Sequence, residues 1–190
     1  MNNIICNSGG AKGSDSIFEE HCMKHGIKVN AFSYKTKYHT SENKVEISDE
    51  DFNEGIEMIK KANEILKRSG IFKFINLLAR NWSQVKYSDD IFAIGKILKP
   101  NEIGDRGFKN KSTYEVVDGG TGYAVAMGIL SNKNVYVFDQ FQNSWFKWSY
   151  IISKFVKCEE PKIRRNFAGI GTRNINENGV IAIGKLFEEL

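Results

Sequence analysis

Three glycine-rich segments of the chain carry the residue types that bind anions. They are Ser8-Gly9-Gly10-Ala11-Lys12-Gly13-Ser14-Asp15, Asp118-Gly119-Gly120-Thr121-Gly122 and Gly169-Ile170-Gly171-Thr172-Arg173. Glycine lets a backbone approach a phosphate closely, and the first N–H groups of a following helix have no intrahelical acceptor. Lys12 and Arg173 each add a full positive charge. These segments therefore predict phosphate-binding turns.

Neither the Walker-type GxxxxGK[ST] motif nor a complete GxGxxG motif is present in the sequence. The absence of the first motif disfavours a Walker-type NTPase. Gly169-Ile170-Gly171 begins a GxGxxG motif, but Asn174 stands where the third glycine belongs. The sequence therefore gives only weak support to a dinucleotide-dependent dehydrogenase.

The elements around the turns predict an α/β fold. A short apolar run at 3–6, a helical pattern at 14–25 and a strand at 28–33 form a βαβ unit, and buried strands are expected at 90–95, 134–139 and 165–170. Alternating strands and helices predict a three-layer, Rossmann-like domain with a mostly parallel sheet. Because ligands bind at the carboxyl ends of such strands, we expect the three turns to meet at one edge.

The other segments complete a single domain over residues 1–190. A polar loop at 34–48, a helix capped by Ser48 and a second helix at 72–83 give a helical elaboration over 34–83. Residues 96–112 are a candidate lid loop, residues 114–117 a short strand, and a helix is expected from Gly122 to Leu130. The aromatic stretch 140–150 reads as a loop, residues 150–156 as an edge element and the last segment as a helix ending at Leu190.

Composition narrows the class of protein. Hydrophobic residues make up 41% of the 190 residues and charged residues 26%, which is typical of a folded domain. No apolar run approaches the length of a membrane span and no secretory signal is seen, so we expect a cytoplasmic protein without a membrane partner. Three cysteines without a CxxC motif fit a reducing compartment. The net charge of +4 suits a small anionic ligand and makes nucleic acid an unlikely partner.

Several polar residues outside the glycines have two interpretations. Asp15 is either a catalytic base or ribose acceptor, or an acid that complements the helix dipole. Asp139 ends a strand and either contacts the ligand or caps the strand. The segment 80–82 either points into the cleft or closes a helix. His21 and His25 share a helix face, but no further ligands accompany them, so no metal and no cofactor are predicted.

The turns resemble those of the SLOG superfamily. Residues 8–15 resemble its SGGAxGAD turn, residues 118–122 its second glycine turn, and Ala168-Gly169-Ile170-Gly171-Thr172-Arg173 the AGIGSR turn that normally opens the fold. Here that opening turn lies near the end of the sequence. The order therefore resembles a circularly permuted, YpsA-like member of the superfamily.

This resemblance implies a nucleotide or a ribose-phosphate as the ligand, bound by a sensor or sequestering module that is a candidate homo-oligomer. The ligand-binding residues it implies are Ser8, Gly9, Gly10, Lys12, Gly13, Ser14, Gly119, Gly120, Thr121, Gly122, Asp139, Gly169, Gly171, Thr172 and Arg173. Members that hydrolyse nucleoside monophosphates carry a PGGxGTxxE motif, in which Tyr123 and Ala126 here replace the threonine and the glutamate. A phosphoribohydrolase or N-glycosidase that uses Asp15 is one alternative. Single-stranded DNA binding, as in the DprA branch, is another.

Overall fold

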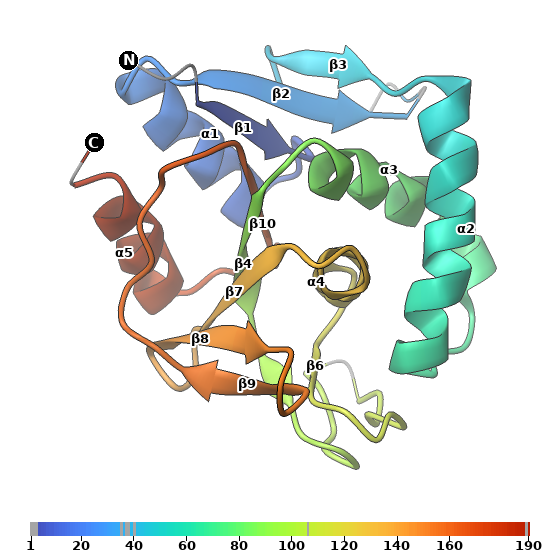
Figure 1. The fold of residues 1–190 in the computed structure, drawn as a ribbon. Helices are drawn as coiled ribbons and strands as arrows, with labels where there is room; N and C mark the ends of the chain where they lie inside the picture. Colours follow the sequence, from blue (N-terminus) through green and yellow to red (C-terminus); the bar gives the residue numbers. More distant parts are fainter. Residues whose placement is uncertain (1–3, 35, 37–38, 40, 106, 189) are drawn as a thin grey trace.

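The computed structural model describes residues 4–34, 36, 39, 41–105, 107–188 and 190. It has three layers (Figure 1). A sheet lies between α1 (Ser14–Lys24) and α5 (Glu177–Leu186) on one face and α2 (Asp49–Leu66), α3 (Ile75–Lys86) and α4 (Thr121–Leu130) on the other. A 3-10 turn, η1 (Ile71–Phe74), precedes α3. The expected α/β, Rossmann-like architecture is confirmed.

Within the described residues the main sheet has eight strands, in the order β3-β2-β1-β10-β4-β7-β8-β9. These are β1 (Ile5–Ser8), β2 (Lys28–Ser33), β3 (Lys44–Glu46), β4 (Asp90–Gly95), β7 (Asn134–Asp139), β8 (Ser144–Ser149), β9 (Lys154–Lys157) and β10 (Phe167–Gly171), while β5 (Ile97–Leu98) and β6 (Val116–Val117) form a separate antiparallel pair. The pairings from β3 through β7 are parallel, and those of β8 and β9 are antiparallel. The carboxyl ends of β1, β10, β4 and β7 therefore lie side by side at one edge.

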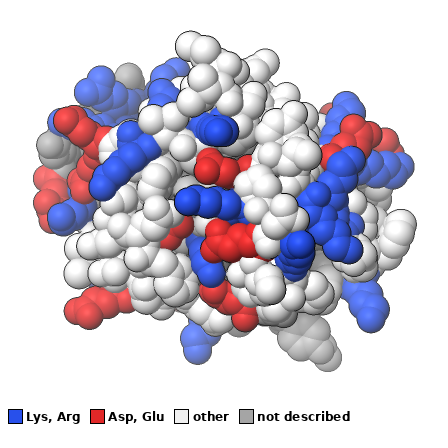
Figure 2. All heavy atoms as spheres, turned by 90° about the horizontal axis from the view of Figure 1, so that it is seen from below, with Lys and Arg blue, Asp and Glu red and all other residues white. Residues whose placement is uncertain are grey.

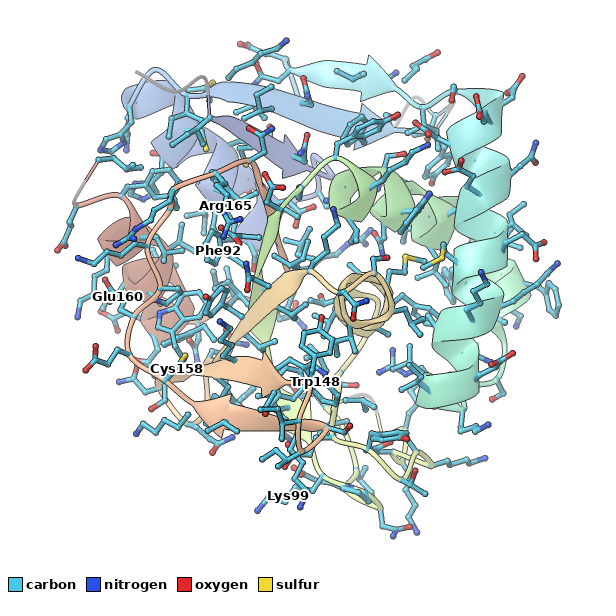
Figure 3. All side chains as sticks on the ribbon, viewed as in Figure 1. Phe92, Lys99, Trp148, Cys158, Glu160 and Arg165 are labelled. Atoms are coloured by element: carbon cyan, nitrogen blue, oxygen red, sulfur yellow. The ribbon has the colours of Figure 1, made fainter. Side chains whose placement is uncertain are left out.

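Both faces of the central strands are buried. In β4, Ile91 and Ala93 pack against the α2, α3 and α4 layer, and Phe92 and Ile94 pack against the α1 and α5 layer. Figure 3 shows Phe92 on the α5 side of the strand. A strand covered on both sides reads as a continuous apolar run, which is why its bounds match the predicted 90–95. The predicted strands at 28–33 and 134–139 also match β2 and β7.

Three predicted loops contain strands and correct the sequence-based expectation. Residues 96–112 include the two-residue strand β5, which pairs with β6. Residues 34–48 include β3, whose three residues are all exposed and pair only with β2, so no apolar pattern marks them. Residues 140–150 include β8, where Trp145 packs into one layer and Trp148 into the other. Because aromatic residues face both sides of β8, it lacks the alternation of polar and apolar residues that would have indicated a strand.

The ends of several elements also differ from the prediction. The first strand is β1 rather than residues 3–6, because its last residues are buried polar ones: Asn7 donates to Tyr87 O at 2.8 Å and Ser8 is fully buried. The closing helix ends at Leu186, not at Leu190. Residues 3 and 189, which belonged to these two predictions, lie outside the described residues, as do residues 35, 37, 38, 40 and 106 of the predicted loops at 34–48 and 96–112.

Candidate functional site

The first and third glycine turns pack directly against each other. Both the backbone N–H and the hydroxyl of Ser14 donate to Thr172 O, at 3.2 and 2.9 Å. Gly13 has a φ of +107°, and a Cβ there would lie 2.7 Å from Thr172 O and from the Cα of Arg173. Only glycine fits this contact, because both the dihedral and the space exclude a side chain. Two segments that are far apart in the chain thus form one wall at the carboxyl edge.

Most backbone donors of this wall are already used inside the protein. Gly13 N donates to Ser16 Oγ at 3.2 Å, Gly171 N to Asp15 Oδ1 at 3.1 Å and Thr172 N to Ile94 O at 2.9 Å. Lys12 and Arg173 lie exposed at its rim. A ligand at this wall would therefore meet the exposed side chains of Lys12 and Arg173 more than unpaired backbone N–H groups.

The second turn offers backbone donors. Gly119, with a φ of +66°, donates its N–H to Asp118 Oδ1 at 2.8 Å, whereas the N–H groups of Gly120 and Thr121 have no acceptor among the described residues. These two N–H groups open α4, where the helix dipole places positive partial charge. The guanidinium of Arg68 donates to Gly119 O and to Val117 O, the latter at 2.6 Å, and adds a full charge beside them. This end of α4 can bind an anion.

Helix α3 connects the first and second turns. Arg80 donates from Nη1 to Gly9 O, and the neighbouring Asn81 donates from Nδ2 to Gly120 O at 3.3 Å. Both side chains are buried, and the Nε of Arg80 has no hydrogen-bond partner in the described part of the chain. Trp82, in contrast, donates to Glu54 on α2 at 2.8 Å. Of the segment 80–82, the first two residues reach the glycine turns and the third does not.

Asp15 is the titratable group at the centre of this arrangement. Its side chain is 4% exposed, and burial raises its pKa to about 6, although the charge of Arg80 opposes the rise. The Asp15 carboxylate and the Arg80 guanidinium both lie 2.7 Å from the position that a Cβ on Gly9 would take. A carboxyl with this pKa can exchange a proton near neutral pH. The site therefore combines an acid–base group with a buried cation.

Other residues predicted to bind the ligand have contacts inside the protein. The Ser8 hydroxyl donates to the buried carboxylate of Glu19 at 2.6 Å. The ring of His39 occupies the space next to Gly10, and a Cβ on Gly169 would lie 2.6 Å from the ring of Phe18. Gly169 thus allows α1 to pack closely on β10 and lies within the core, not at the edge.

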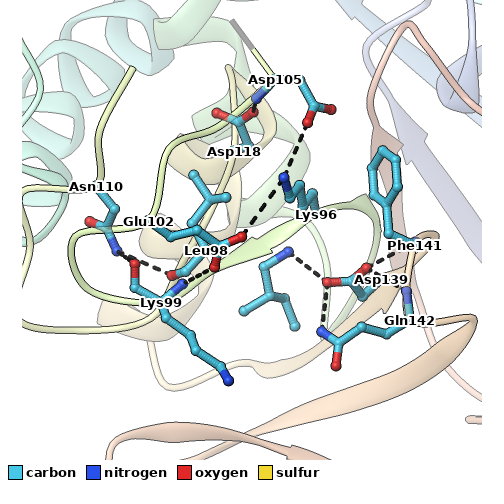
Figure 4. A network of polar contacts seen from close by, with 11 residues as sticks. Lys96, Leu98, Lys99, Glu102, Asp105, Asn110, Asp118, Asp139, Phe141 and Gln142 are labelled. Carbon is cyan, nitrogen blue, oxygen red and sulfur yellow. Dashed lines mark hydrogen bonds and ion pairs between the residues drawn. The ribbon is translucent and has the colours of Figure 1, made fainter. Parts of the chain in front are cut away.

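Asp139 is engaged by its own turn (Figure 4). Its Oδ2 accepts from Ile97 N and from Gln142 Nε2, both at 2.9 Å, and its Oδ1 accepts from Phe141 N and Gln142 N, both at 3.0 Å. The side chain is 1% exposed. The geometry matches the strand-end cap that was one of its two interpretations.

The candidate lid loop at 96–112 is anchored to the rest of the molecule. The buried Asn110 donates to Leu98 O, Lys99 O and Tyr114 O at 3.0 to 3.1 Å. Asp105 N donates to Asp118 Oδ2 at 3.0 Å, which connects the loop to the second glycine turn (Figure 4). Lys96 forms ion pairs with Asp105 and Glu102 in the same network. The loop therefore adjoins the site and has an ordered internal frame.

The histidine pair on α1 has a packing role. His21 stacks on Phe187 of the closing segment with 5.2 Å between ring centroids, and the Nδ1 of His25 lies 2.8 Å from His21 O. Among the described residues, no group of three or more His, Cys, Asp or Glu side chains is placed to hold a metal ion.

Charged side chains are mixed on the face seen in Figure 2. Lys and Arg alternate with Asp and Glu across its middle and gather mainly toward its margins. Within the described part of the chain, none of the helices combines the length and apolar character that crossing a bilayer requires.

The fold and the edge of the sheet define a Rossmann-like α/β protein with a candidate anion site at the carboxyl ends of its parallel strands. Comparison with known proteins adds no relative: no family model, no curated protein and no solved structure matches the chain.

Proposed function

We propose that the protein binds a nucleotide or another ribose-phosphate at the carboxyl edge of the sheet. The observation that carries this proposal is the placement of Arg80 and Asn81, adjacent on α3, against Gly9 O and Gly120 O. This contact supports the proposal that the first and second turns are two sides of one site. The phosphate lies at the start of α4, where the N–H groups of Gly120 and Thr121, which have no acceptor among the described residues, lie beside Arg68.

The sugar lies toward the first turn in this proposal. The Asp15 carboxylate and the Arg80 guanidinium both lie next to Gly9, and Arg80 Nε has no partner among the described residues. A carboxylate and a guanidinium both bind ribose hydroxyls. Lys12 and Arg173, exposed at the rim, add charge that attracts an anion before it binds. The binding residues proposed here are Gly9, Lys12, Asp15, Arg68, Arg80, Gly120, Thr121 and Arg173.

We also propose that the chain is a circularly permuted member of the SLOG superfamily. Counted from β10 instead of β1, the parallel strands have the spatial order 4-3-2-1-5-6. This order is that of a doubly wound sheet, in which the chain first builds strands to one side and then to the other. The placement of α1 and α5 on one face and of α4 on the other supports the same reading.

Calorimetric titration with inorganic phosphate, ribose 5-phosphate and the nucleoside monophosphates tests the binding proposal. We expect a ribose-phosphate to bind more tightly than phosphate alone. Arg80→Lys should weaken its binding at least about tenfold, because lysine keeps the charge but not the planar donor fork. Arg164→Lys, at an exposed position between β9 and β10, is the matched control. If none of these compounds binds the wild type, the proposal is wrong.

A second candidate function is hydrolysis of the N-glycosidic bond of a nucleoside monophosphate. The raised pKa of Asp15 favours it, because this reaction needs a carboxyl group that can donate or accept a proton. Ala126, at the position of the family glutamate, is buried in the core and cannot take that role. Chromatography for released base separates the two functions: release that disappears in Asp15→Asn supports hydrolysis, and intact substrate supports binding alone.

A further inference from the structure

A hollow lies between α4, the β8–β9 hairpin and residues 114–117, and it includes Gly122 at the end of the second glycine turn. Its volume is about 330 Å³, which is sufficient for a small organic molecule. Val117, Val125 and Ala126 form a buried apolar floor. Tyr114 and Tyr150 at the rim are 43% and 45% exposed, so the hollow opens to solvent. Figure 3 shows Trp148 between the hairpin and α4.

The lining combines aromatic rings with one negative charge. Tyr114, Trp148, Tyr150 and Phe155 contribute rings, and those of Trp148 and Phe155 meet edge to face with centroids 5.0 Å apart. Glu115 is the only lining side chain, among the described residues, that is charged at neutral pH. Its Oε2 accepts from Phe155 N at 3.0 Å, which fixes the carboxylate beside the rings.

We propose that this hollow binds an organic ammonium with an apolar, ring-sized substituent. Ring faces carry negative electrostatic potential, and together with a fixed carboxylate they favour a cation over an anion or a neutral group. The apolar floor takes the substituent and excludes water from it. The protein has a net charge of +4 and therefore does not attract cations in general. A preference of the hollow for a cationic ligand must come from the aromatic rings and the carboxylate of Glu115. The proposal does not depend on nucleotide binding at the glycine turns.

The test compares two probes of similar shape and opposite charge, 2-phenylethylammonium and 3-phenylpropanoate. Amide NMR spectra of the full chain follow each titration. We expect the ammonium to shift the signals of Gly122, Val125 and Phe155, and to bind at least about tenfold more tightly than the carboxylate. Glu115→Gln should remove this preference, since glutamine can still accept from Phe155 N but carries no charge. Glu159→Gln, at an exposed position outside the hollow, should keep it.

Ala126→Leu supplies an independent variant that fills the floor of the hollow. We expect it to abolish the shifts while its spectrum remains that of a folded protein. The proposal is overturned if neither probe shifts these signals up to its solubility limit, or if the two probes bind equally. Binding that survives both Ala126→Leu and Glu115→Gln would overturn it as well.

Discussion

At the scale of single residues, each buried charge at the carboxyl edge has hydrogen-bond partners on other segments of the chain. Asp15 accepts from Gly171 N at 3.1 Å on the third turn, and Arg80 donates to Gly9 O on the first. Glu19, also buried, accepts from the hydroxyls of Ser8 and Ser41, both at 2.6 Å. Buried charges are retained only where such partners compensate their lost hydration. A substitution at any of them should therefore change the stability of the edge and, under the proposed function, its affinity for the ligand.

Asp15→Asn should alter how stability depends on pH. The folded pKa of Asp15 is raised from 3.8 to about 6, so the folded state holds this proton more tightly than the unfolded state. The resulting stabilisation is present below about pH 4 and is lost as the pH rises to about 6. Relative to Asp15→Asn, the wild type should lose about 3 kcal/mol of unfolding free energy across that range. Urea unfolding of both proteins at several pH values measures this, and parallel curves would contradict it.

Gly13→Ala should destabilise the protein far more than Gly26→Ala. Both glycines have positive φ, at +107° and +66°. A Cβ on Gly13 would lie 2.7 Å from Thr172 O, whereas no atom of the described residues lies within 4 Å of a Cβ on Gly26. We expect a loss of about 1 kcal/mol at Gly26 from the dihedral alone, and at least about 2 kcal/mol more at Gly13 from the steric clash. Thermal unfolding of the two variants gives the difference. Equal losses would show that the two turns can separate without cost.

At the scale of elements, side chains decide the shape of the long connections. Ser48 begins α2 by accepting from Asp51 N at 3.0 Å, as expected of its position before an acidic first turn. The loop that follows β5 depends on Asn110, whose amide holds three backbone carbonyls. Asn110 therefore fixes the base of the candidate lid, alongside the contacts of Asp105 and Lys96.

Asn110→Ala should loosen the loop at 96–112 and leave the sheet intact. It removes the donor to three carbonyls at a buried position, which should cost about 2 to 4 kcal/mol. We expect cleavage by a protease within the loop to speed up at least about tenfold, because local opening becomes more frequent. Asn53→Ala, on the exposed surface of α2, is the matched control. Unchanged cleavage sites and rates would show that other contacts hold the loop.

At the scale of the whole molecule, the sheet is assembled from both ends of the chain. β10 lies between β1 and β4, and Ile4 belongs to the same apolar cluster as Leu186 and Phe187. Figure 1 shows the two chain ends on the same side of the molecule. If the two ends of the chain were joined, it would therefore run from β10 through α5 directly into β1.

A permuted chain that begins at Glu160 and joins Leu190 to Met1 by a flexible linker should fold. The new start lies in the exposed segment between β9 and β10, so no strand or helix is cut (Figure 3). We expect a cooperative unfolding transition and the ligand affinity of the parent. A chain opened at Phe92, inside β4, should not fold and serves as the control. If the permutant that begins at Glu160 does not fold, the proposal of a circularly permuted doubly wound sheet is contradicted.

The sequence by itself determined the elements that local pattern encodes. Continuous apolar runs gave β4 and β7, and the cap at Ser48 gave the start of α2, because burial on both faces and capping are read within a few residues. Glycine turns before helices predicted that all three turns meet at the carboxyl edge. The structure packs the first turn against the third, while the second follows β6 of the separate antiparallel pair. The exposed β3 and the aromatic β8 were missed, since neither carries a periodic pattern.

Only the tertiary structure decided how these turns are used. It satisfied most N–H groups of the first and third turns internally, engaged Asp139 in its own loop and placed Gly169 in the core. It also brought in Arg68, for which the sequence gave no signal, and decided between the two interpretations of Arg80, because both roles arise from helix packing between segments distant in sequence. Burial, which raises the pKa of Asp15, is likewise a property of the assembled edge: the same carboxyl in an extended chain would remain hydrated.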